Sequence, residues 1–482
     1  MQKKLAELEL LSRQLDPEPG VRKLLFEQVG AYSEAFLEQL PAAKTFIRDQ
    51  GNDGFTASPI GEQGEEVSSL LAFYRREVDT TGILPASGGQ LGYIPGGGLY
   101  PSALGDFLAG ISNRYSGVAF AGPGAARMEH SLVQWMCRLA GWPESAAGDL
   151  TSGGTTATLS ALVTARDACG IDHIEIPRAC VYLTEQAHHC IGKAMHVAGL
   201  KDIQKRVIPM DSRFRMDVAA LEQAIREDRA RDLNPWLVIA SAGTTDTGAV
   251  DPLPGIAEVA KNNALWLHVD AAYGGFFRLC PEGQERLAGM EAADSIVMDP
   301  HKGLGLPYGT GAVLIREGHL LARSNAYYAD YMQDAKPPEH SVGQAFSPAD
   351  YSLELTRPFR GPRMWFPLKF FGLRPFRAAL SEKIWLARYF YEELGKLEEF
   401  ELGPYPDLSI VTFRFRPDGG DIDALNRRLL QAVHDDGKVF ITSTLIGGTF
   451  TLRLAVLNFR THRQTIDYLL KLLQAKAEEL AG

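Results

Sequence analysis

The feature that most constrains the fold is an alternation of strand-like and helix-like patterns between about residue 102 and residue 320. Short, continuous apolar runs recur there, and helical patterns lie between several of them. These apolar runs cover residues 179–183, 236–240, 265–269, 295–298 and 311–315. Continuous apolar strands that alternate with helices are typical of a mostly parallel sheet covered on both faces. The sequence therefore predicts an α/β fold, in which ligands bind at the carboxyl ends of the strands.

Helical patterns come first in the chain. Residues 2–15 place Leu5, Leu8, Leu11 and Leu15 on one stripe, and residues 23–40 and 62–78 show a similar periodicity. Such an arm cannot bury its stripe alone, so we expect it to pack on something else, and a partner subunit is one candidate.

A smaller α+β unit is predicted at the other end of the chain. It follows a loop-rich segment, 325–362, and its expected elements are helix 374–396, strand 408–415, helix 421–435, strands 438–443 and 449–456, and helix 462–480. We therefore predict three parts: an N-terminal helical arm (1–90), a large α/β domain (91–370) and a small α+β domain (371–482).

Composition excludes several classes of protein. The 482 residues carry a net charge of −10, which argues against a nucleic-acid or anionic membrane surface. No apolar run approaches the roughly 20 residues of a membrane span, and no signal peptide is visible. The five cysteines are scattered without a CxxC spacing, which favours a reduced, cytoplasmic setting and no metal site.

Two stretches of the alternating region could hold an anion and a flat ring. In "TSGGTTATLSAL" (151–162), two glycines and two threonines precede a helix, which is typical of a phosphate cradle or, equally, of a simple helix cap. In "TEQAHHCIGKA" (184–194), a histidine follows a strand. It could stack on a planar ring, although an isolated pair of this kind is more often structural.

Two further stretches place opposite charges at strand ends. Asp270, in "LHVDAAYGG", ends an apolar strand, where a carboxylate needs a partner; a structural ion pair is the plain alternative. Lys302, in "DPHKGLGLPYGTG", follows another strand, where a surface lysine is the usual finding. Near a carboxylate, a histidine and a phosphate cradle, that lysine suggests a Schiff base. Together the four stretches call for a phosphate, a cationic ring and an aldehyde, which pyridoxal 5′-phosphate combines.

These stretches, together with "SAGTTDTGAVDP", resemble the group II pyridoxal-phosphate-dependent amino-acid decarboxylases, which include the aromatic-L-amino-acid decarboxylases. The resemblance covers roughly residues 90–375. It implies the type I fold of pyridoxal-phosphate-dependent transferases, which is aspartate aminotransferase-like. It also implies a homodimer with shared active sites and an amino-acid substrate.

The resemblance also implies roles for individual residues. Lys302 would form the Schiff base, at a site that favours its neutral amine. Asp270 would hold the proton on the ring nitrogen, so that the ring can accept the electron pair left by CO₂. His188 would stack on one face of the ring and Ala272 would pack on the other. Thr245 would lie near the cofactor hydroxyl and the substrate carboxylate.

The phosphate would lie on Gly153, Gly154 and Thr155, with His301 beside it. Asp299 is a departure from the family pattern, because the animal aromatic enzymes have an asparagine at its position. A carboxylate there would repel the dianionic phosphate.

The substrate side is predicted from the same resemblance. Tyr331 matches a mobile-loop tyrosine that protonates Cα, and a phenylalanine there goes with aldehyde formation. The side-chain pocket would be lined by Tyr93, Ile94 and Pro95, with Tyr115 reaching in from the neighbouring subunit. This lining is aromatic and aliphatic, which favours an aromatic substrate.

Several other functions stay open at this point. They are a carbon–carbon lyase like the sphingosine-phosphate lyases, a glutamate- or aspartate-type decarboxylase, an aldehyde-forming oxidative decarboxylase, and an aminotransferase that grips the α-carboxylate with Arg453. A cofactor-binding protein without activity is a further alternative, since fold alone does not fix function.

Overall fold

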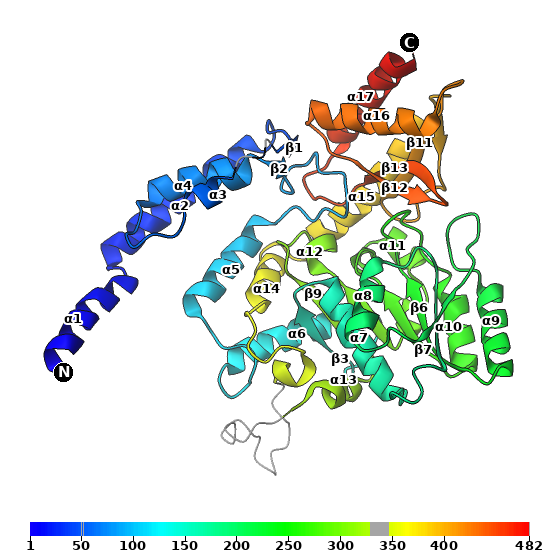
Figure 1. Ribbon diagram of the computed structural model, residues 1–482, viewed down its shortest axis with the longest axis horizontal. Coiled ribbons are helices and arrows are strands. Elements are labelled where there is room, and N and C mark those ends of the chain that lie inside the picture. Colours follow the sequence, from blue (N-terminus) through cyan, green and yellow to red (C-terminus); the bar gives the residue numbers. More distant parts are fainter. Residues whose placement is uncertain (50, 52, 328–346, 482) are drawn as a thin grey trace.

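The centre of the protein is a seven-stranded sheet, seen in the computed structural model in Figure 1, which describes residues 1–49, 51, 53–327 and 347–481. Its strands, in spatial order, are β3 (Ala147–Thr151), β9 (Gly311–Ile315), β8 (Ser295–Met298), β7 (Trp266–Asp270), β6 (Asn234–Ser241), β4 (Ala179–Leu183) and β5 (Gln204–Val207). Strand β9 runs antiparallel to both of its neighbours, and the other neighbouring pairs are parallel. The predicted mostly parallel sheet is therefore confirmed.

Both faces of this sheet are covered, as the continuous apolar strands predict. Alternate residues of β6 belong to two separate cores: Val238 and Ala240 to one, Leu237 and Ile239 to the other. The surrounding helices are α5 (Tyr100–Ser112), α6 (Pro123–Leu139), α7 (Gly154–Ala168), α8 (His189–Val197), α9 (Val218–Ala230), α10 (Leu253–Asn262), α11 (Pro281–Arg286), α12 (Pro300–Gly303), α13 (Gly318–Asn325) and α14 (Gly361–Phe371).

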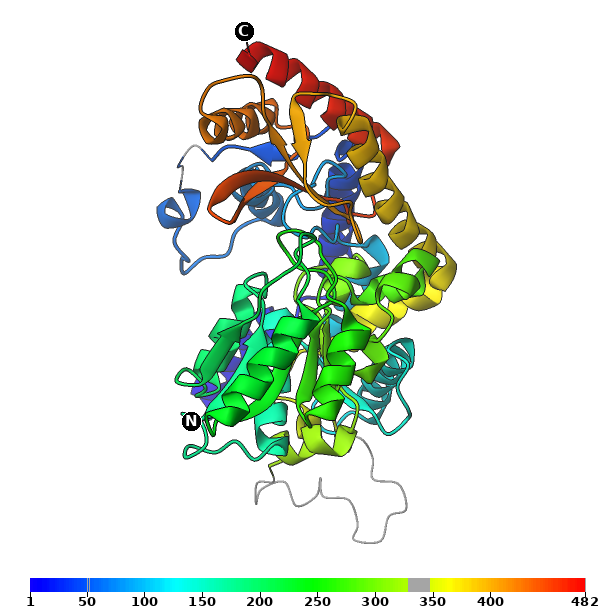
Figure 2. The same cartoon turned by 90° about the vertical axis from the view of Figure 1, so that its right-hand side faces the viewer.

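A second, smaller sheet lies near the C-terminus and forms the opposite end of the molecule in Figure 2. Its four antiparallel strands, in spatial order, are β10 (Phe400–Leu402), β11 (Ile410–Phe415), β13 (Thr449–Ala455) and β12 (Thr442–Ile446). The helices packed with it are α15 (Leu373–Leu394), α16 (Ile422–Asp436) and α17 (Arg463–Ala481). The predicted boundaries between domains stay a prediction.

The strand expected at residues 438–443 is wrong in its position, because β12 begins only at Thr442. Strands β12 and β13 form a hairpin in which Ile446 pairs with Thr449. The two residues between them, Gly447 and Gly448, have φ angles of 54° and 80°, as a tight two-residue turn requires. This glycine pair sets the hairpin register and moves the strand toward the turn.

The N-terminal arm is helical and largely exposed. Its elements are α1 (Gln2–Ser12), α2 (Pro19–Gln39), the short α3 (Gly54–Ala57), α4 (Val67–Tyr74) with a π-helical continuation (Arg75–Asp79), and the two-stranded pair β1 (Phe46–Ile47) and β2 (Gly82–Ile83). Neither α1 nor α2 contains a buried residue, and α1 points away from the sheets in Figure 1. Among the described residues, every helix is too short or too polar to cross a membrane.

Candidate active site

A cavity of about 330 Å³ lies at the carboxyl edge of the large sheet. Its walls come from the ends of β6, β7 and β8 and from the starts of α7 and α8. Parallel pairing brings these strand ends together: Asp270, the last residue of β7, pairs with Ser241 on one side and Val297 on the other. The strand ends chosen from the sequence therefore meet at one place.

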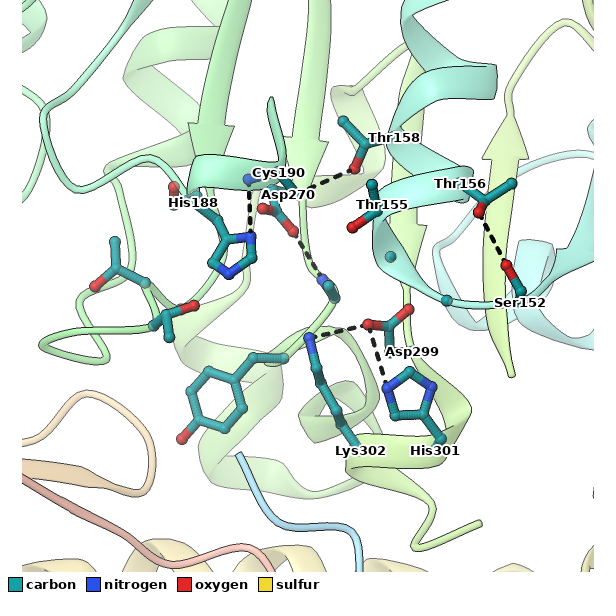
Figure 3. A pocket seen from close by; sticks show the side chains of 18 of the residues that line it. Ser152, Thr155, Thr156, Thr158, His188, Cys190, Asp270, Asp299, His301 and Lys302 are labelled. Carbon is teal, nitrogen blue, oxygen red and sulfur yellow. Dashed lines mark hydrogen bonds and ion pairs between the residues drawn. The ribbon is translucent and has the colours of Figure 1, made fainter. Parts of the chain in front are cut away.

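The structure brings together all of the residues predicted to bind the cofactor. They line this one cavity: Gly153, Gly154, Thr155, His188, Thr245, Asp270, Ala272, His301 and Lys302. Figure 3 shows that Lys302, Asp270 and His188 approach the same space from different elements. Their individual roles stay predictions. Tyr331 lies outside the described residues.

The amine of Lys302 lies against a carboxylate. Its Nζ is 2.9 Å from Oδ2 of Asp299, three residues earlier in the chain (Figure 3). Burial alone would lower the pKa of Lys302, but the charge and hydrogen bond of Asp299, together with the charge of Asp270, outweigh burial and raise the pKa above its ordinary value. This pair favours the ammonium form, and the neutral amine expected while the cofactor passes between lysine and substrate stays a prediction.

The predicted phosphate cradle is the beginning of α7. This 15-residue helix begins after Gly153, and no side chain of the described residues caps its first amide groups. These donors are therefore available to bind an anion. The cradle needs glycine, because a Cβ on Gly154 would come 2.8 Å from Oδ2 of Asp299. The imidazole of His301 lies beside it, since a Cβ on Gly153 would be 3.6 Å from Cε1 of His301.

Both predicted histidines are held as neutral rings. His188 caps α8, and its Nδ1 accepts a hydrogen bond from the amide of Cys190 at 3.3 Å, which places the ring proton on Nε2. His301 uses Nδ1 differently and donates to the carbonyl of Thr310 at 2.6 Å. Burial lowers the pKa of both histidines. A neutral, oriented imidazole at His188 suits stacking on a cationic ring.

Asp270 and Ala272 form the floor of the ring site. Oδ1 of Asp270 accepts a hydrogen bond from the amide of Ala272 at 3.1 Å, which fixes the carboxylate at the end of β7. Ala272 is 9% exposed and offers a small, flat surface.

Sequence reasoning missed Tyr273, although it stands in the quoted stretch "HVDAAYGG". It lines the cavity and is 3% exposed. Its hydroxyl accepts from the amide of Ser409 at 2.9 Å and lies 2.7 Å from Oγ of the same serine, so it joins the large sheet to the C-terminal part. Burial raises its pKa to about 12, which keeps the phenol neutral.

Arg453 does not line the cavity but lies behind one of its walls. It is 3% exposed, and its Nε donates to the carbonyls of Thr245 at 2.7 Å and Asp246 at 3.2 Å. This arginine therefore holds the 245–246 loop to β13. That position does not favour the aminotransferase alternative.

The predicted substrate-side residues do not line this cavity in the single chain. The Tyr93 side chain is 61% exposed with its ring 6.0 Å from Phe440. Ile94 and Pro95 are buried next to it. The hydroxyl of Tyr115 donates to the carbonyl of Leu355 at 3.1 Å. Their assignment to the substrate pocket stays a prediction.

The donor set fits pyridoxal 5′-phosphate. The uncapped start of α7 can bind the phosphate, and Asp270 can face the ring nitrogen. The space between His188 and Ala272 suits a flat ring, and Lys302 can reach the aldehyde. The fold and this site define the class as a type I pyridoxal-phosphate enzyme.

Comparison with known proteins agrees with this class. Residues 86–416 match the family model described as "Pyridoxal-dependent decarboxylase conserved domain". The chain is 33% identical over 449 residues to an aromatic-L-amino-acid decarboxylase of Bacillus atrophaeus, covering 92% of each protein. A solved structure of Oryza sativa TDC with PLP and tryptamine superimposes with a TM-score of 0.90 at 25% identity, covering 97% of this chain and 99% of that one.

The chain belongs to the pyridoxal-dependent decarboxylase family. It is therefore a pyridoxal-phosphate-dependent carboxy-lyase that acts on an amino acid.

The cradle yields a test that does not depend on turnover. In Gly154→Ala, the added Cβ would meet Asp299 at 2.8 Å and would crowd the phosphate position, so we expect cofactor affinity to fall at least about tenfold, or 1.4 kcal/mol. Gly192→Ala is the matched control, because a Cβ there meets nothing within 4 Å on α8. Titration with pyridoxal phosphate measures both variants; equal affinities would contradict the placement of the cradle.

Proposed function

We propose that the chain decarboxylates an aromatic L-amino acid to the corresponding amine and CO₂. The observation that carries the proposal is the single cavity in which Lys302, Asp270 and His188 face the free start of α7. The substrate class is supported by relatives named aromatic-L-amino-acid decarboxylase, tyrosine decarboxylase 3 of Petroselinum crispum (29% identity) and tryptophan decarboxylase 2 of Oryza sativa (29% identity).

Each residue then has a physical task. Bound pyridoxal phosphate supplies a protonated ring that accepts the electron pair released when CO₂ leaves. Asp270 holds the proton on the ring nitrogen, because a carboxylate next to a base favours the protonated form. The neutral ring of His188 would pack against one face of the cofactor ring, and Ala272 would pack against the other. Lys302 would hold the cofactor aldehyde through its amine.

The cavity offers little positive charge to bind a second carboxylate on the substrate side chain. Among the described residues that line the cavity, Lys302 is the only lysine or arginine. Arg453 uses its Nε to hold the 245–246 loop. A glutamate- or aspartate-type substrate would find no further lysine or arginine in this cavity. The aromatic and aliphatic side chains of Tyr93, Ile94 and Pro95, outside the cavity, favour an aromatic substrate.

We also propose that the protein is a homodimer with shared active sites. Along α1 and the turn that follows it, Leu5, Leu8, Leu11 and Leu15 are 58%, 49%, 64% and 88% exposed in the single chain. An apolar stripe of this size is a poor water-facing surface, and a second copy of the arm would cover it. Tyr115 of the neighbouring subunit would then complete the substrate pocket.

A cytoplasmic location is supported by cysteine chemistry. All five cysteines are free thiols, and burial raises the pKa of every one: Cys137 and Cys190 to about 12, and Cys169, Cys180 and Cys280 to about 11. Such unreactive thiols suit a reducing compartment.

An amino-acid panel tests the proposed reaction. We expect L-tyrosine, L-tryptophan or L-phenylalanine to release CO₂ and amine in equal amounts without peroxide, and L-glutamate and L-aspartate to release far less. Lys302→Ala is the control and should abolish release. A preference for L-glutamate, or aldehyde and peroxide in place of amine, would contradict the proposal.

Sedimentation measures the proposed dimer. We expect a particle of twice 52.8 kDa, and a dissociation constant at least about tenfold higher for Leu8→Glu/Leu11→Glu, because each buried leucine contributes about 1.5–3 kcal/mol. Lys4→Glu, a charge change at a polar position of the same helix, should leave it unchanged. A monomeric parent chain, or a double variant as tightly dimeric as the parent, would refute the proposed interface.

A further inference from the structure

Asp299 stands in an unusual position for a carboxylate. It is 1% exposed, and one of its oxygens, Oδ1, is buried without a hydrogen-bond partner among the described residues. The other oxygen, Oδ2, lies 2.9 Å from Nζ of Lys302 and 3.8 Å from Nε2 of His301. Lys302 is therefore its main source of positive charge.

The same carboxylate is packed against the phosphate cradle. A Cβ on Gly154 would come 2.8 Å from Oδ2, and a Cβ on Gly311 would come 2.8 Å from Oδ1. The carboxylate thus lies so close to Gly154, the first residue of α7, that even a methyl side chain there would collide with it. Figure 3 shows it between Lys302 and the start of that helix.

These contacts would bring two negative groups, the carboxylate of Asp299 and the phosphate of the cofactor, close together at the start of α7. The uncapped amides of α7 attract an anion. At separations of a few ångströms in a partly buried site, two like charges repel by several kcal/mol. The only lysine or arginine among the described residues that line the cavity is the one already paired with Asp299.

We propose that Asp299 is a resident anion that limits how tightly the cradle holds the phosphate of the cofactor. Asp299 is a positioning residue in this sense: it pairs with Lys302 beside the cradle and opposes the incoming phosphate. The inference concerns the cofactor's phosphate and holds whichever amino acid is the substrate.

The test uses two ligands that cannot form a covalent bond with Lys302. Pyridoxamine 5′-phosphate carries the ring and the phosphate without an aldehyde, and pyridoxamine carries the ring alone. Calorimetric titration of the full-length chain, stripped of cofactor, gives the affinity of each. The proteins compared are the parent, Asp299→Asn, Asp299→Ala, Lys302→Ala and the double variant Lys302→Ala/Asp299→Asn. Asp232→Asn is the control, since that side chain is 94% exposed on the surface.

We expect both Asp299 variants to bind pyridoxamine 5′-phosphate at least about tenfold more tightly than the parent, with less than about a threefold change for pyridoxamine. Having two neutral variants guards against one of them folding poorly, which circular dichroism would reveal. Asp232→Asn should match the parent.

The Lys302→Ala background separates direct repulsion from an effect through the amine. If the carboxylate repels the phosphate directly, removing it should still raise the affinity for pyridoxamine 5′-phosphate when the ammonium is absent. A gain that disappears in this background would overturn the proposal, as would equal gains for both ligands or no gain in either Asp299 variant. Failure of every protein to bind pyridoxamine 5′-phosphate would also overturn it and would contradict the cofactor, whereas a different substrate preference would leave it intact.

Discussion

The site depends on the parallel pairing of β6, β7 and β8. Because these strands run in the same direction and Asp270 pairs with Ser241 and Val297, their ends lie at one edge of the sheet. A shift of one residue in this register would turn Asp270 from the cavity toward a hydrophobic core. The antiparallel β9 then returns the chain beside β8, so that Lys302 and the start of α7 face each other across the cavity.

The C-terminal part stabilises the same cavity from the other side. Arg453 on β13 holds the carbonyls of the 245–246 loop, and Ser409 bonds the hydroxyl of Tyr273. Two cavity walls therefore depend on contacts between segments that are more than 130 residues apart in the chain. Buried groups of this kind are bonded because leaving them unpaired would cost free energy.

The sequence was a good guide to strands with strong apolar patterns and a poor one elsewhere. Strands β4, β8 and β9 have the expected bounds because each is a short run made almost entirely of apolar residues. Strand β3 was missed since Gly148 and Asp149 interrupt its pattern, and the edge strand β5 was missed since its sequence, "QKRV", is mostly polar. Both segments form strands because they pair with a neighbouring strand, and a local sequence pattern does not reveal that pairing.

The candidate site likewise has features that the sequence predicted and features that it did not. Residue types near strand ends and helix starts indicated the phosphate cradle, a histidine, Asp270 and Lys302. The family resemblance added the other residues predicted to bind the cofactor, and all of them meet in one cavity. The pair between Lys302 and Asp299 was not foreseen, because it depends on the turn of α12 that brings residues three apart together. The predicted substrate residues stay a prediction, since neither Tyr93 nor Tyr115 lines this cavity.

The central claim is that Lys302 forms the covalent bond with the cofactor aldehyde. Borohydride reduction of the cofactor-loaded protein, followed by peptide mapping, tests it most directly. The account predicts one modified peptide, containing Lys302. A tag on another lysine, or no tag in protein that retains the cofactor, would contradict it.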